Sequence, residues 1–299
     1  MSVLVRSQMR GRQARIKGPR PVAKAVDPLN VLPPRYEREA IQAVRAMLES
    51  VVDQVPAATI ERAITHPQVL DSLDLGLDTD ALTAALLGTV REAGTREARS
   101  IRVVKAEPAL RASFNLNDPR AEAWARSSSA RLVVEVTAST RDSIRNLITR
   151  AIVEGGHPSV VARQIKPLIG LHSRWSNAVL NYRYGLEAGG LPVSSVESLT
   201  AKYYDRLLTT RSRTIARTEI LSASNQGKYL GMVQAQSQGL LPGTATKVWI
   251  AAGDAEAVCA DLDGTEVGLQ EDFSSELGDV AHPPLHPNCR CTIAIGKGS

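Results

Sequence analysis

The sequence lacks long apolar runs and is poor in cysteine and in aromatic residues. No stretch approaches the ~18 consecutive apolar residues that a membrane-spanning helix requires. Three cysteines cannot form a fully paired disulfide framework, so a reducing compartment such as the cytosol is expected. Phe, Trp and Tyr make up only 4% of the chain, whereas 43% is hydrophobic. These proportions favour helices packed through aliphatic and small side chains.

Several catalytic and nucleotide-binding motifs are also missing from the sequence. There is no P-loop, no Gly-x-Gly-x-x-Gly turn, no Gly-x-Ser-x-Gly elbow and no His-Glu-x-x-His helix. We find no internal repeat and no low-complexity segment. The sequence therefore gives no support for an NTPase, a dinucleotide-dependent enzyme, a serine hydrolase or a zinc protease of the common types.

Positive charge is concentrated at the N-terminus. Residues 1–26 contain seven basic and no acidic residues, the remainder has a net charge of −2, and the last 49 residues have −7. A segment of this kind is typical of an arm that binds a polyanion such as a nucleic acid, or an acidic protein surface. The candidate nucleic-acid-binding residues are Arg6, Arg10, Arg12, Arg15, Lys17, Arg20 and Lys24.

Three regions follow from the distribution of charge, proline and hydrophobic period. Residues 1–34 are expected to form a disordered basic arm, residues 35–243 an elongated helical body, and residues 244–299 a small C-terminal domain. The predicted fold class is mainly α, with a loop-rich α+β unit at the C-terminus. A DNA-binding protein proper would need a basic folded surface, and the balance outside the arm disfavours one.

Helical periodicity and proline or glycine breaks divide the body into segments. Helices are expected from Pro34 to Pro56, from Thr59 to Ile64, from Thr79, from Asp118-Pro119, over a short stretch after Pro158, over 172–186 and over 196–238. The β-branched run 132–136 predicts a short strand, after which Ser139 or Thr140 would cap a new helix that ends at Gly155-Gly156.

The last of these helices contains a motif-like stretch. Arg217 and Glu219 are two residues apart, so they face different sides and are expected to form separate salt bridges. Gly227 lies on a stripe of small residues that would let another backbone approach closely. There, leucine is expected to overpack, whereas alanine is expected to be mild or stabilising.

Cysteine and histidine gather near the C-terminus. Strands are expected over 247–251, near Val267, and over 292–295, with Cys259 in a polar loop. Pairing of the first and last strands would bring Cys259 to the His286-Pro287-Asn288-Cys289-Arg290-Cys291 segment. A domain of some fifty residues buries only a small hydrophobic core and often needs a disulfide or a structural metal ion to be stable. We therefore predict one structural zinc ion on Cys259, His286, Cys289 and Cys291, with His282 as the reserve ligand.

Other interpretations of these residues remain open at this point. The thiols can be buried and free, since cysteine behaves as a small hydrophobe, or Cys289 and Cys291 can form a strained disulfide. A cysteine hydrolase would combine Cys259 with His282 or His286 and with an orienting Asp254 or Asp261. No known local signature surrounds Cys259.

Five motifs in a fixed order resemble a protein family. They are Ile215-Ala216-Arg217-Thr218-Glu219, Asn225-Gln226-Gly227, Trp249, Leu262-Asp263-Gly264 and His286-Pro287-Asn288-Cys289-Arg290-Cys291. Over roughly residues 115–295 the chain resembles the phage Mu F-like minor head proteins, or head morphogenesis proteins, of tailed bacteriophages. Family members often have a further Cys-x-x-Cys or His before Leu-Asp-Gly, where this sequence has only Cys259.

The resemblance implies a structural role in a virion. It implies a minor capsid protein inside the head at the portal vertex, made in the host cytoplasm, that assists head assembly and DNA packaging or ejection. The implied partners are the portal protein and the major capsid or scaffolding protein, with packaged DNA on the arm and no membrane. The alternative is an enzyme that is carried in the virion and delivered with the DNA.

Overall fold

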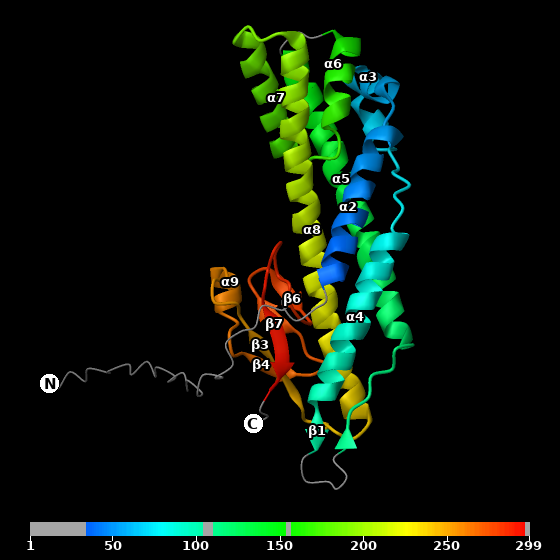
Figure 1. Ribbon diagram of the computed structural model, residues 1–299, viewed down its shortest axis with the longest axis vertical. Coiled ribbons are helices and arrows are strands. Elements are labelled where there is room, and N and C mark those ends of the chain that lie inside the picture. The colour runs from blue at the N-terminus through cyan, green and yellow to red at the C-terminus, as the bar shows by residue number, and fades with distance from the viewer. Residues whose placement is uncertain (1–33, 104–109, 154–156, 297–299) are drawn as a thin grey trace, which may run out of the picture.

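The structure, a computed structural model, describes residues 34–103, 110–153 and 157–296, and it shows a long helical bundle with a small strand-containing unit against one end (Figure 1). The fold is mainly α, as predicted. The expectations for the arm, including its seven basic residues, lie outside the described residues. Among the described residues, no helix is sufficiently long and apolar to cross a lipid bilayer.

The helical part is built around one long helix. α8 (Val193–Ser237) has 45 residues, so it is about 68 Å long. α4 (Asp80–Ser100) and α2 (Pro34–Gln54) pack along it, and α7 (Ser173–Ala188) runs back beside its first half (Figure 1). α3 (Ala57–Thr65), α5 (Pro119–Val153) and α6 (Pro158–Ile165) complete the bundle, with short 3-10 turns η1 (Pro67–Leu70) and η2 (Lys166–Leu168).

Most helices begin at a proline or directly after one. α2 begins at Pro34, and Pro56 precedes α3. α5 begins at Pro119, α6 at Pro158, and Pro192 precedes α8. Proline fixes φ near −65° and has no N–H to lose, so it suits the first turn of a helix. The apolar residues at helical spacing on α2 and α4 are mostly buried and contribute to the main core.

The predicted strand over 132–136 is wrong, because this run lies inside α5. Leu132 and Val136 are one helical turn apart and face the core, whereas Val134 between them is 68% exposed. Thr140 does not cap a new helix, since its Oγ1 donates to the carbonyl of Val136 within the same helix. α5 ends at Val153, and the expected Gly155-Gly156 stop lies outside the described residues.

Gly227 allows α8 and α4 to approach closely. It is buried, and a Cβ built there would overlap the Val90 carbonyl oxygen and lie 2.8 Å from the Ala93 Cβ. The predicted small-residue contact is confirmed. The expected tolerance of alanine is wrong, because the neighbouring atoms include the α4 backbone.

The C-terminal unit contains a three-stranded antiparallel sheet in the order β4-β3-β7, from Glu266–Gly268, Thr246–Ile250 and Thr292–Ile295. A hairpin of β5 (Phe273–Ser275) and β6 (Gly278–Val280) lies beside it. The two-residue strands β1 (Arg102–Val103) and β2 (Leu110–Arg111) pair at the end of α4. As predicted, the strand at 247–251 pairs with the strand at 292–295, with Val248 opposite Ala294.

Candidate metal-binding site

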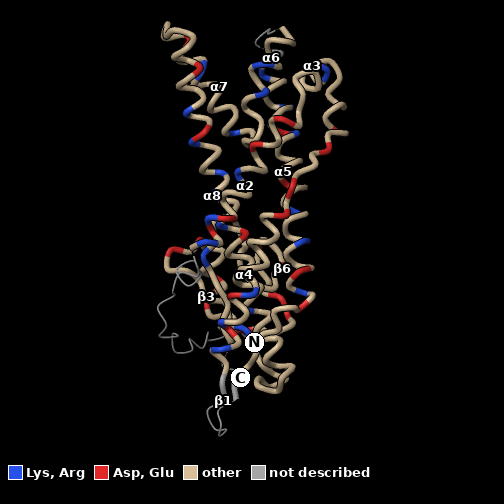
Figure 2. Tube along the Cα trace, turned by 45° about the vertical axis from the view of Figure 1, so that its right-hand side comes forward, with Lys and Arg blue, Asp and Glu red and all other residues tan. Residues whose placement is uncertain are grey.

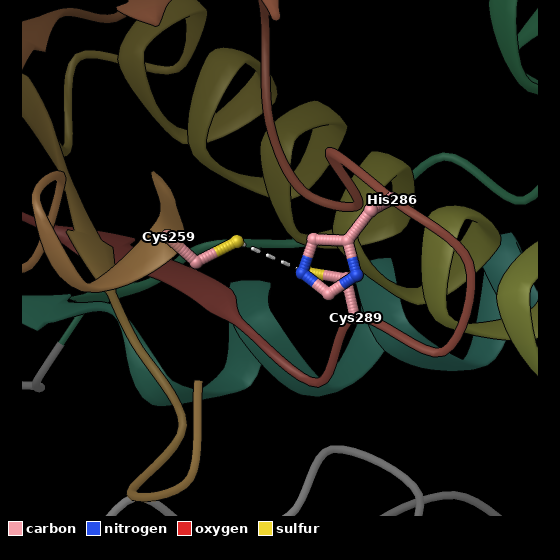
Figure 3. Close-up of side chains that lie close together, drawn as sticks. All are labelled: Cys259, His286 and Cys289. Carbon is pink, nitrogen blue, oxygen red and sulfur yellow. Dashed lines mark hydrogen bonds between the residues drawn. The ribbon is translucent and has the colours of Figure 1, made fainter. Parts of the chain in front are cut away.

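Three potential metal ligands converge between α9 and the loop that precedes β7. α9 (Ala257–Ala260) carries Cys259, so this cysteine lies in a short helix and not in the loop that was expected. His286 and Cys289 come from the loop (Figure 3). One potential ligand atom from each of the three residues lies within 4.8 Å of the other two, and the Cys259 and Cys289 sulfurs are 3.6 Å apart.

The backbone explains why these residues meet. β3 pairs with β4 and β7, which brings the chain after Trp249 next to the chain before Thr292. Gly264 has φ = 76°, a conformation that favours glycine, and it closes the return from α9 by donating its N–H to the Trp249 carbonyl. Asp263 accepts a hydrogen bond from the Ala251 N–H in the same turn. Asn288 has φ = 59° and turns the chain between His286 and Cys289.

His286 presents one ring nitrogen, Nε2, to the sulfurs, and this nitrogen has no hydrogen-bond partner among the described residues. Its Nδ1 lies 3.0 Å from the Pro287 carbonyl oxygen and 3.5 Å from Glu256 Oε1. Two acceptors on this side hold the proton on Nδ1, which leaves the Nε2 lone pair free. Nε2 is buried and has no hydrogen-bond partner among the described residues. A buried nitrogen of this kind fits a metal ligand.

The pKa values of the three cysteines are shifted in different directions. Cys291 lies beside Cys289, and its hydrogen bond is the main reason that the pKa of Cys289 is lowered to about 5. Burial raises the pKa of Cys259 to about 12, and the hydrogen bond to Cys289 raises the pKa of Cys291. Cys289 is therefore the thiolate, stabilised by two neighbouring thiols. All three sulfurs are buried and none is in a disulfide.

The reserve ligand His282 does not join this cluster. Its Nε2 is 2.8 Å from Gln226 Oε1 on α8, and its Nδ1 is 2.7 Å from the Pro283 carbonyl oxygen. Burial lowers the pKa of His282 to about 4, so the ring is neutral at pH 7. His282 contributes to the contact between the C-terminal unit and the bundle.

Residues 215–227 of α8, the α8 motif, fix the loop of residues 281–291, the Cys/His loop, to the bundle. Asn225 is fully buried, and its Nδ2 donates to the carbonyls of Pro283 and Cys291 at 3.2 Å each. Its Oδ1 accepts from Thr292 Oγ1 at 2.8 Å. Thr218 Oγ1 accepts from the Asn288 N–H, and Lys228 donates to Thr292 Oγ1 at 2.5 Å. One face of α8 thus binds both ends of the loop.

The remaining motif residues have structural partners. Arg217 and Glu219 do not pair with each other, as predicted. Arg217 Nε lies 3.2 Å from Glu37 Oε1 on α2, and Glu219 accepts from Ser128 Oγ on α5 at 2.8 Å. Trp249 is fully buried edge-on against Phe273, with ring centroids 5.2 Å apart.

The geometry does not assemble the triad of the alternative hydrolase interpretation. Cys259 is completely buried. Asp254 pairs with Arg290, and Asp261 is exposed. Among the described residues, the carboxylate near His286 belongs to Glu256, which sequence reasoning missed. Its position three residues before Cys259 was the available signal.

Comparison with known proteins agrees with the motifs. The family model "Phage Mu protein F like protein" matches residues 142–294, which extend from the last third of α5 through α8 to β7. No curated protein and no solved structure matches the chain. The match covers more than half of the sequence and includes the α8 motif and the Cys/His loop. The chain therefore belongs to the phage Mu F-like family of head morphogenesis proteins.

Proposed function

We propose that this chain is a minor capsid protein that lies inside the head of a tailed phage, at the portal vertex, and assists head assembly and DNA packaging or ejection. The family match is the observation that carries the proposal. The structure suits this role, because α8 connects a long bundle to the C-terminal unit through buried hydrogen bonds at Asn225. The bundle would contact the portal protein and the capsid or scaffolding protein.

Co-expression tests the proposed location. The chain would be produced with the portal, scaffolding and major capsid proteins of the phage that encodes it. We expect the chain to enter procapsids in a fixed low number of copies only when the portal is present. Incorporation that is independent of the portal, or complete exclusion from procapsids, would contradict the portal-vertex location.

We also propose that the Cys/His cluster binds one structural zinc ion. Two thiolates at about 2.3 Å from a tetrahedral zinc lie roughly 3.8 Å apart, close to the 3.6 Å between the Cys259 and Cys289 sulfurs. His286 supplies the unpartnered Nε2. Cys291 bonds Cys289 but is not one of the three residues whose ligand atoms converge, so its side chain would have to turn towards them to serve as the predicted fourth ligand. When bound, zinc would supply folding free energy to a unit with a small core.

DNA binding is assigned to the N-terminal residues and not to the bundle. In the view of Figure 2, Lys/Arg and Asp/Glu positions are interspersed along the helices. Removal of residues 1–26 should therefore abolish most retention on duplex DNA at low salt, because each neutralised phosphate contributes about −0.9 to the logarithmic salt slope. Equal DNA binding by the full and truncated chains would contradict this assignment.

A further inference from the structure

A groove of about 810 Å³ lies in the half of the bundle that is distant from the Cys/His loop. Its walls come from α2, α7, α8 and the α6–η2 segment (Figure 1). Leu168 and Leu208 are buried at its floor, and Val52, Val160 and Ala201 add apolar surface. This volume is within the range of about 300–1,000 Å³ of ligand pockets.

A buried hydroxyl in this groove has no partner. Thr200 lines the groove and is 8% exposed, and its Oγ1 has no hydrogen bond among the described residues. Thr210 and Thr218 on the same helix donate to the carbonyl four residues before them. Thr200 lacks that bond. An unpaired buried hydroxyl is unfavourable, so a polar ligand that displaces the side chains covering Oγ1 and bonds it would gain a hydrogen bond there.

The charges at the rim leave two carboxylates available. Arg45 is neutralised by Glu49 and Asp205, and Arg183 pairs with Glu187 just outside the groove. The exposed Asp53 and Glu197 have no ion pair in the part of the chain that the structure describes. Arg163, the remaining cation that lines the groove, donates to the Ser159 carbonyl and has no ion pair among the described residues. The unpaired groups therefore have a net charge of −1, which favours a ligand that combines apolar side chains with a cation.

We propose that this groove binds the first residues of the same chain. Val3, Leu4 and Val5 followed by Arg6 supply an apolar run next to a cation. The length of the chain permits this, because the 28 residues from Arg6 to Pro34 can span up to about 90 Å, whereas Arg45 is only about 16 Å along α2 from Pro34. A tethered ligand has an effective concentration in the millimolar range, so a weak contact suffices.

A labelled peptide tests the proposal directly. A fluorescein-labelled peptide of residues 1–12 would be titrated with the full chain and with a variant that lacks residues 2–26, with fluorescence anisotropy as the readout. We expect saturable binding to the truncated variant and at least tenfold weaker binding to the full chain, whose groove is occupied. A peptide with Leu4→Ser should bind the truncated variant at least fivefold more weakly.

Charge reversal locates the binding surface. In the truncated variant, Asp53→Lys combined with Glu197→Lys should weaken peptide binding at least tenfold, and Thr200→Val should weaken it severalfold. Glu276→Lys, an equal change on an exposed residue of the C-terminal unit, should leave it unchanged. Thermal melts would verify that each variant is folded.

Three results would overturn the proposal. They are no saturable binding to the truncated variant, equal binding by the full chain, and binding that is insensitive to the charge reversals. A dimer of the full chain that dissociates when residues 2–26 are removed would instead place the segment in the groove of a second copy. Sedimentation velocity of both proteins distinguishes that arrangement.

Discussion

Asn225 on α8 donates a hydrogen bond to the backbone carbonyl of Cys291, sixty-six residues later in the chain, at 3.2 Å. The same amide group donates to the Pro283 carbonyl and accepts from Thr292 Oγ1, so both of its N–H donors and one of its two acceptor lone pairs are used. Two of the family-like motifs are thus in direct contact. The orientation of the Cys/His loop depends on a side chain of the bundle.

Replacement of Asn225 should therefore destabilise the C-terminal unit. Asn225→Ala leaves two carbonyls and one hydroxyl without this partner in a buried site, which should cost roughly 2–4 kcal/mol of unfolding free energy. Asn181→Ala on the exposed face of α7 is the control and should change stability by less than about 0.5 kcal/mol. Urea denaturation measures both. An Asn225→Ala variant as stable as the control would show that the loop does not depend on this amide.

Glycine-to-alanine changes should have opposite effects at two helical positions. Gly227→Ala should destabilise the protein by roughly 1–3 kcal/mol, because the new methyl group meets the α4 backbone at Val90 and Gly94. Gly185→Ala on α7 should stabilise it by about 0.5–1 kcal/mol, since a Cβ there meets no atom within 4 Å and alanine favours helix. Thermal unfolding gives both values. Equal effects of the two substitutions would contradict the close contact of α8 with α4.

Local signals predicted most of the fold. Proline at the first turn and apolar residues at helical spacing placed α2, α4, α6 and α8, because these signals act within one helix. The run at 132–136 misled, since β-branched residues suit both a strand and a buried helix, and only the contacts of Leu132 and Val136 decide between them.

The approach of Cys259 to the Cys/His loop could be predicted from the sequence because it follows from the pairing of two strands. Once the strands at 247–251 and 292–295 are paired, Cys259 must lie near His286 and Cys289. The role of Glu256 beside His286 was not predictable, because it depends on how α9 is oriented. The bond from His282 to Gln226 was equally hidden, since the two residues meet only when the C-terminal unit is placed on α8.

Glu256 should strengthen metal binding through His286. Because it lies 3.5 Å from Nδ1, it favours the tautomer in which Nε2 is a ligand. Glu256→Gln should weaken zinc affinity about 10–100-fold, whereas Glu276→Gln, exposed in the same unit, should not. Competition with a chromophoric chelator measures the affinity, and elemental analysis of protein purified without chelators gives the stoichiometry. Less than about a tenth of an equivalent of zinc in the unmodified protein would refute the site itself.

Removal of zinc should also loosen the C-terminal unit. Metal binding stabilises only the folded state, so an excess of chelator should lower the unfolding temperature. His286→Ala should remove this chelator effect. His282→Ala should retain it, because His282 contacts Gln226 and not the cluster. A chelator effect that survives His286→Ala would exclude His286 as a ligand.

His282 should make stability depend on pH. Burial is the main cause of its lowered pKa of about 4, nearby Lys247 lowers it further, and Asp272 opposes the shift. The unfolded chain has a pKa near 6.5, so it binds the proton more readily than the folded chain. The contribution of neutral His282 to the free energy of unfolding is fully present above about pH 6.5. It is lost as the pH falls towards 4, and below that pH the free energy does not change further through this group. The expected loss of unfolding free energy is about 1–3 kcal/mol.

Urea denaturation between pH 7 and 4 should show a shallower decline of unfolding free energy for His282→Gln than for the unmodified protein. His157→Gln, a change at an exposed histidine, should leave the decline unchanged. Identical pH profiles for His282→Gln and the unmodified protein would show that this histidine does not couple protonation to unfolding.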